Sequence, residues 1–111
     1  MELTFDWREP LHIGPRWFEE CLNTDKAAEV AKIKGPILAI NGLSDTTVTP
    51  DNADQIVAAS TNDASMTYFI EDCDHTFNVF SGDFSALGEA VGAGIAFFQE
   101  VLGGVSADAA A

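Results

Sequence analysis

Residues 35–45, Gly-Pro-Ile-Leu-Ala-Ile-Asn-Gly-Leu-Ser-Asp, contain the pattern on which the fold prediction depends. Residues 37–40 form an unbroken apolar run, whereas a strand with one face in water would alternate between apolar and polar residues. The run therefore predicts an inner strand of a parallel sheet, covered by helices on both faces. Gly42 predicts a tight turn after this strand, and Asp45 then places a carboxylate near the strand's carboxyl end.

A second strand is predicted over residues 65–70, Ser-Met-Thr-Tyr-Phe-Ile. Between the two strands, Thr49 and Pro50 suit the N-cap and the first position of a helix over residues 50–60. A strand, a helix and a strand within about 35 residues have the length of a right-handed crossover. The two strands are therefore expected to be parallel neighbours, and His75 follows the second one.

The longest predicted helix covers residues 84–102 and is expected to end at Gly103-Gly104, with Asp83 or Ser81 capping its start. Its apolar positions are spaced by three or four residues: Phe84, Leu87, Val91, Ile95, Phe98 and Leu102. Glycines inside a helix usually mark a close approach to a neighbouring element, and this helix contains Gly88, Gly92 and Gly94. One side of it is therefore expected to lie tightly against the sheet. Residues 105–111 are expected to fray.

The amino-terminal part of the chain predicts a packing or lid element. Residues 1–13 show no clear period and are interpreted as an irregular lead-in. A helix is predicted over residues 15–22 and a second over residues 24–32, which Thr24 would cap. The first carries a narrow apolar stripe of Trp17, Phe18, Cys21 and Leu22. At under about 12 residues each, these helices need a partner surface.

Composition predicts one soluble domain, or a piece of one, with a strongly acidic surface. The chain has 111 residues, 47% of them apolar, and 18 acids against 5 bases give a formal net charge of −13. All five bases precede Gly35, and eleven acids follow it. Such a surface repels phosphates and anionic lipid headgroups, so neither a nucleic acid nor a membrane is expected as a partner. No calcium-loop motif occurs, and no cofactor or metal is expected.

Cysteine usage and the amino terminus predict a cytoplasmic location. Cys21 and Cys73 are too few and too far apart for a disulfide framework, so two free thiols are expected, with a bridge between them left open. The amino terminus has neither a basic start nor an apolar run, which indicates no secretory signal. No stretch of the sequence is long and apolar enough to predict a transmembrane segment.

Asp45 and His75 are the candidate catalytic residues. In an open parallel sheet, functional groups gather at the carboxyl ends of the strands. Although 30 positions separate these residues, the Asp45 carboxylate is expected to accept a hydrogen bond from the His75 ring, as in the orienting half of a catalytic triad. The alternatives are a turn or capping role for Asp45 and a surface or core position for His75. Cys73, Asp74 and His75 lack the spacing of a zinc site, and Cys73 is expected to be a buried thiol.

The strand that ends in Gly-Leu-Ser-Asp, the Asp74-His75-Thr76-Phe77 loop and the long helix with Phe97-Phe98 near its end together resemble the carboxyl-terminal portion of the α/β-hydrolase superfamily. The resemblance is closest to its esterase, dienelactone-hydrolase and serine-aminopeptidase-like members, and it covers roughly residues 17–102. It implies an α/β chain with a partial α/β-hydrolase fold, in which Asp45 is the triad acid and His75 the general base.

In domain terms, the resemblance implies a single partial domain over residues 1–111. Residues 1–34 would be the lead-in and cap-like helices. Residues 35–104 would contain the last two parallel strands of the sheet with their flanking helices, and residues 105–111 the tail.

The sequence departs from that family in its nucleophile. No Gly-x-Ser-x-Gly motif occurs, and none of the six serines lies in a strand-to-helix elbow. We therefore expect this chain to supply the acid and base of a serine hydrolase that cleaves ester or amide bonds in small molecules. Its partner would be the missing amino-terminal half or, by self-association, a second copy. The alternative is a non-catalytic binding module or homodimer with an α/β-hydrolase-like fold.

Overall fold

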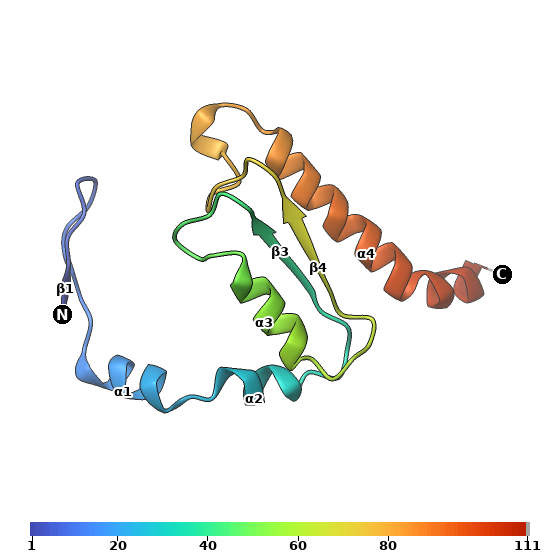
Figure 1. Cartoon of the computed structure of the whole chain (residues 1–111), viewed down its shortest axis with the longest axis horizontal. Coiled ribbons are helices and arrows are strands. Elements are labelled where there is room, and N and C mark those ends of the chain that lie inside the picture. Colours follow the sequence, from blue (N-terminus) through green and yellow to red (C-terminus); the bar gives the residue numbers. More distant parts are fainter. Residues whose placement is uncertain (111) are drawn as a thin grey trace.

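The computed structural model describes the backbone of residues 1–110 and the side chains of residues 1–103. The described chain is a mixed α/β structure (Figure 1). Its elements, in order, are β1 (Glu2–Leu3), β2 (Leu11–His12), α1 (Pro15–Asn23), α2 (Lys26–Ala31), β3 (Leu38–Gly42), α3 (Asp51–Ala59), β4 (Met66–Ile70), a 3₁₀ turn η1 (Val79–Ser81) and α4 (Ser85–Ala110).

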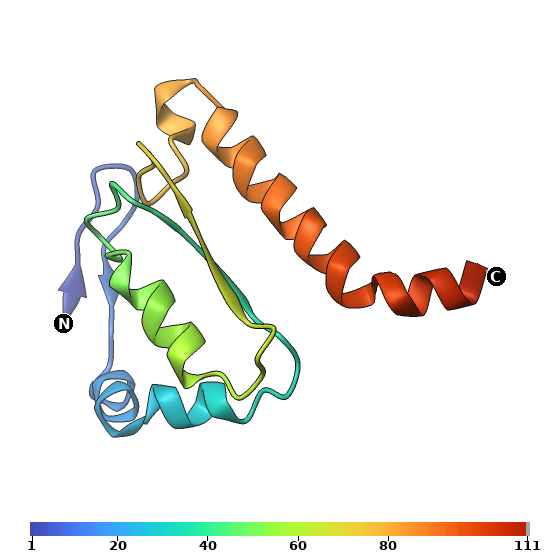
Figure 2. The same ribbon diagram turned by 45° about the vertical axis from the view of Figure 1, so that its right-hand side comes forward.

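The centre of the molecule is the parallel pair of β3 and β4, as the crossover length predicted. The strands pair in register from Leu38 opposite Met66 to Gly42 opposite Ile70. Helices α3 and α4 lie on opposite sides of this pair (Figures 1 and 2). The covered faces explain why the apolar run of β3 does not alternate. Within residues 1–110 the sheet has only these two strands, so neither outer edge has a strand neighbour.

Gly42 is the last residue of β3 and begins the predicted tight turn, in which the Asp45 amide donates to the Gly42 carbonyl at 3.2 Å. A side chain at this position would collide with the carbonyl oxygen of Cys73. Glycine is therefore needed so that the loop after β4 can approach the end of β3. This close approach brings together the two segments that carry Asp45 and His75.

The core is small and lies mainly between the strands and α4. It consists of Ile70, Cys73, Ala86 and Ala90, with Ile40, Tyr68 and Phe77 packed against it. On the other side of the strands, α3 buries Ala53. Alanines at the contacts allow both helices to lie close to the sheet.

The apolar stripe of α4 faces away from this core, and the glycines do not contact the sheet. Phe84, which immediately precedes α4, and Val91, Ile95, Phe98 and Leu102 within it are between 54% and 61% exposed, whereas Leu87 is half-buried. Apart from the adjoining residues and the helix's own backbone, no described atom lies within 4 Å of a Cβ built at Gly88, Gly92 or Gly94, so the prediction of a close approach at these glycines is wrong. The helix packs instead through Ala86, Ala90 and Phe97, which are at least 92% buried.

Helix α4 also extends further than predicted. Gly103 keeps a helical backbone in place of the left-handed conformation that ends a helix, and α4 continues to Ala110. The predicted end at Gly103-Gly104 is therefore wrong. Residues 105–110, which were expected to fray, belong to this helix, and residue 111 lies outside the described residues. At its start, the Ser85 amide donates to Asp83 Oδ1 at 2.9 Å, which confirms Asp83 as a capping residue.

Three local predictions near the helix starts and the amino terminus are corrected by the structure. Residues 1–13 are not irregular throughout, because β1 and β2 pair as a short antiparallel hairpin. Asp25, and not Thr24, caps α2 by accepting from the Ala28 amide at 3.0 Å. Thr49 does not cap α3, since its hydroxyl donates to the Asp51 carboxylate.

Helix α1 presents most of its apolar side chains to solvent, and Phe18 is half-buried. It contains no buried residue, and Trp17 and Leu22 are 53% and 85% exposed. No helix within residues 1–110 is both long and apolar enough to cross a membrane.

Candidate active site

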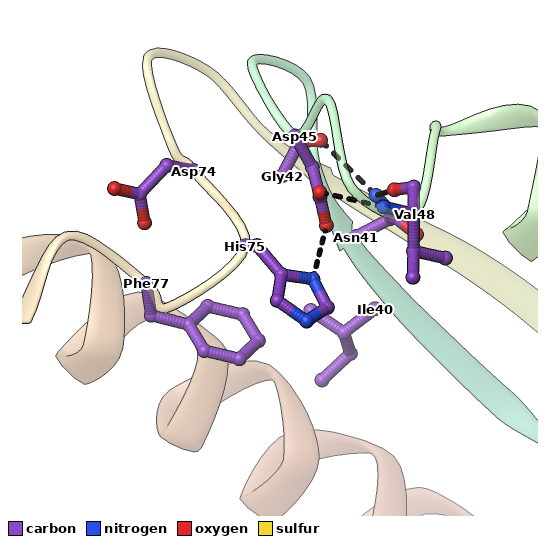
Figure 3. Close-up of a pocket in the computed structure, with 8 residues that line it drawn as sticks. All are labelled: Ile40, Asn41, Gly42, Asp45, Val48, Asp74, His75 and Phe77. Carbon is purple, nitrogen blue, oxygen red and sulfur yellow. Dashed lines mark hydrogen bonds and ion pairs between the residues drawn. The ribbon is translucent and has the colours of Figure 1, made fainter. Parts of the chain in front are cut away.

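Asp45 and His75 meet at the carboxyl end of the parallel pair, as expected from the sequence. Asp45 lies in the turn after β3 and His75 in the loop after β4, and the parallel register brings these two segments to the same edge. His75 Nδ1 lies 3.0 Å from Asp45 Oδ2 (Figure 3). The Asp45 side chain is only 6% exposed, whereas that of His75 is 49% exposed. A buried carboxylate thus supports an accessible imidazole.

Backbone amides fix the orientation of the Asp45 carboxylate. Its Oδ1 accepts from the amides of Thr47 and Val48, both at 2.9 Å, which leaves Oδ2 directed at His75. The buried side chain of Asn41 supports this turn by donating to the carbonyls of Gly42 and Val48, each at 3.1 Å. Sequence reasoning missed Asn41, although a polar residue at the end of an apolar strand was the available signal.

The Asp45 carboxyl is held in its charged form. Burial raises its pKa, but the hydrogen bonds from the Val48 amide, the His75 ring and the Thr47 amide lower it, and the net shift is downward. A carboxylate that remains ionised beside Nδ1 favours a proton on that nitrogen. This leaves Nε2 free to accept a proton whenever the ring is neutral.

The end of β3 is joined directly to the loop that carries His75. The Leu43 amide donates to the Ile70 carbonyl at 2.9 Å, and the Ser44 amide donates to the Cys73 carbonyl at 3.0 Å. Together with the close approach at Gly42, these bonds fix the distance between the two catalytic candidates.

The loop from Asp72 to Asn78 is tightly closed by its own side chains. Asp74 Oδ1 accepts from the Thr76 amide at 2.8 Å and from the Thr76 hydroxyl and the Asn78 amide at 2.9 Å. These hydrogen bonds lower the pKa of Asp74, and the bond from the Asn78 amide has the largest effect. Figure 3 shows its carboxylate pointing away from the His75 ring, so Asp74 is a structural member of the loop.

An open cleft of about 220 Å³ adjoins the pair. Its lining residues, shown in Figure 3, are Ile40, Asn41, Gly42, Asp45, Val48, Asp74, His75 and Phe77. None of them has a hydroxyl or thiol that could act as a nucleophile. Within the described part of the chain, His75 Nε2 has no hydrogen-bond partner, so the cleft offers space for a proton donor at this nitrogen.

Cys73 is fully buried, as expected, and both cysteines are free. Burial raises the pKa of the Cys73 thiol, which makes a thiolate nucleophile unfavourable. Among the side chains of residues 1–103, no group of three or more His, Cys, Asp or Glu is arranged to hold a metal ion.

No protein-family model matches the chain, and no curated protein matches its sequence.

Proposed function

We propose that this chain supplies the acid and the general base of a serine hydrolase that cleaves ester or amide bonds in small molecules. The observation that carries the proposal is the 3.0 Å contact between Asp45 Oδ2 and His75 Nδ1, formed at the carboxyl ends of two adjacent parallel strands. The burial of Asp45 and the exposure of His75 support it, because a triad acid orients the imidazole from within while the imidazole faces the substrate.

In this function His75 Nε2 takes the proton of an attacking hydroxyl and then delivers it to the leaving group. Asp45 keeps the neutral ring in the tautomer that leaves Nε2 unprotonated, and it stabilises the imidazolium formed during attack. The two amide bonds to Asp45 Oδ1 fix the carboxylate in the orientation that this role requires.

The nucleophile in this proposal comes from residues outside the 111 residues of this sequence. Its absence from the cleft lining supports this arrangement, as does the outer edge of β3, which is unpaired within residues 1–110. A strand added parallel to β3 would end at the same edge as Asp45 and His75, and could present a serine there. The alternative of a non-catalytic binding module or homodimer gains its support from the exposed apolar stripe of α4.

The test joins this chain to the coding sequence immediately upstream of it. We expect that sequence to encode a Gly-x-Ser-x-Gly motif, and the longer product to react with a serine-directed fluorophosphonate. His75→Ala should then lower the rate of activated-ester hydrolysis by a factor on the order of 10⁴ to 10⁶, and Asp45→Asn by a factor on the order of 10⁴.

His12→Ala is the matched control, because His12 is exposed on the hairpin and should leave the rate unchanged. An upstream sequence without a nucleophile motif, or full activity in His75→Ala, would overturn the proposal.

The 111-residue chain alone should neither hydrolyse activated aryl esters above background nor react with the fluorophosphonate. Stoichiometric labelling of any of its own serines would contradict the assignment of the nucleophile to another segment.

A further inference from the structure

The backbone around His75 is unusual because three non-glycine residues adopt the left-handed conformation. Asp72, Phe77 and Asn78 have φ values of 51°, 55° and 60°. Asp and Asn tolerate this conformation, but it is strained for a bulky residue such as Phe. The surrounding contacts must therefore hold this loop in place.

Asn78 makes the contacts that close the loop. Its Oδ1 accepts from the Asp74 amide at 2.9 Å, its Nδ2 donates to the Asp72 carbonyl at 2.7 Å, and its own amide donates to Asp74 Oδ1 at 2.9 Å. The first and third of these bonds form a reciprocal pair between Asn78 and Asp74. His75 lies inside this closed segment, immediately after Asp74.

Phe77 ties the same loop to the core. It packs against the cluster that contains Ile70 and Ala86, and its ring lines the cleft beside His75 (Figure 3). The backbone turns sharply here, so that the Phe77 ring packs against the core while the His75 imidazole reaches Asp45. The strain at Phe77 and the hydrogen bonds of Asn78 thus belong to one arrangement.

We infer that Asn78 is a positioning residue whose side chain closes residues 72–78 and holds the His75 ring against Asp45 before any nucleophile is present. The inference rests on the proposed function, since the position of the ring matters for catalysis only if His75 is a base. Asn78 itself is not among the residues that line the cleft, and it makes no hydrogen bond to the His75 ring. Asp45 and His75 are thus already held in their paired arrangement by this chain alone.

The test measures the tautomer of His75 by two-bond proton–nitrogen correlation in the full 111-residue chain at a pH where the ring is neutral. The parent chain should carry the proton on Nδ1, because this nitrogen donates to Asp45. Asn78→Gly retains the freedom to adopt a positive φ but removes both side-chain bonds. It should lower the population of the Nδ1–H form by at least about twofold, since the ring then exchanges between Asp45 and water.

Asn62→Gly is the matched control. Asn62 also donates to a distant carbonyl, that of Lys34 at 3.0 Å, and accepts from a nearby amide, that of Ala64 at 2.9 Å. It precedes β4 and therefore lies at the opposite end of the strands from His75. Its replacement should weaken the fold without changing the His75 tautomer.

A second variant covers the case in which Asn78→Gly does not fold. Asn78→Asp keeps the acceptor for the Asp74 amide and the tolerance of a positive φ, but it loses the donor to the Asp72 carbonyl. We expect its population of the Nδ1–H form of His75 to lie between those of the parent and Asn78→Gly. This population therefore tests the inference even if Asn78→Gly does not fold.

An unchanged tautomer in a folded Asn78 variant would overturn the inference and leave the proposed function intact. An equal shift in Asn62→Gly would also overturn it, because the effect would then be one of global stability. A parent chain without the Nδ1–H form would overturn both the inference and the proposed acid–base pair.

Discussion

Asp45 is the residue whose environment decides the chemistry at this site. It is almost fully buried, yet it accepts two amide hydrogen bonds and one from an imidazole. Its position after a strand and a glycine could be predicted from the sequence. The amide pair and the support from Asn41 could not, because they depend on the path of the turn up to Val48.

Acid should destabilise the fold partly through this group. The pKa of Asp45 is lower in the folded chain than its ordinary value of 3.8, so the folded state binds this proton less readily than the unfolded state does. The resulting stabilisation is fully present above about pH 5 and is lost as the pH falls below 3.8 through the folded-state value.

Urea unfolding at a series of pH values measures this loss. Asp45→Asn should show a weaker decline in the free energy of unfolding between pH 5 and pH 3 than the parent, because it has no carboxyl to protonate at this position. Equal declines in the two proteins would show that Asp45 does not contribute to the acid sensitivity.

At the scale of the elements, the sequence predicted the strand–helix–strand unit well because its signals are local. The apolar run of β3, the proline before α3 and the apolar positions of β4 each act within one element. The packing side of α4 was not predictable in this way. The helix has an apolar stripe on one side and alanines on another, and only the tertiary structure shows that Ala86 and Ala90 face the strands.

Two glycines with opposite environments test this description of packing. Gly42→Ala should lower the free energy of unfolding by about 1–3 kcal/mol, because the added carbon forces the Cys73 backbone to move. Gly88→Ala should raise it by about 0.5–1 kcal/mol, because alanine is favoured in a helix and its methyl group meets no described atom of a neighbouring element there. Thermal or urea unfolding of both variants measures the difference. A stabilised Gly42→Ala variant would show that β3 and the His75 loop do not approach closely.

For the whole molecule, the exposed apolar surface is large relative to the core. Helix α4 extends beyond the strands (Figure 2), and Val91, Ile95, Phe98 and Leu102 of its apolar stripe are exposed to solvent. The outer edge of β3 has no neighbour within residues 1–110, and unpaired strand edges and apolar patches both promote association. The sequence predicted an incomplete sheet, but it did not indicate that the α4 stripe would be exposed.

We expect the isolated chain to associate, and more strongly at high salt. The charge of −13 opposes association, but its repulsion is screened over about 8 Å at physiological ionic strength and about 3 Å at 1 M salt. Light scattering across a salt series measures the average molecular mass of the protein in solution.

Ile95→Glu should lower the average mass, because it places a charge within the α4 stripe. Gln99→Glu is the control, since it adds the same charge at an exposed polar position beside the stripe. A monomer at high salt and high protein concentration would contradict this prediction.

The tautomer of His75 in Asp45→Asn tests the acid–base pair most directly. Because the Thr47 and Val48 amides require an acceptor at the Oδ1 position, the Asn amide nitrogen must occupy the Oδ2 position and donate to His75 Nδ1. Nitrogen NMR of the neutral ring should therefore show the proton on Nδ1 in the parent and on Nε2 in Asp45→Asn, with His12 unchanged in both. The same His75 tautomer in both proteins would contradict the pairing of the two side chains.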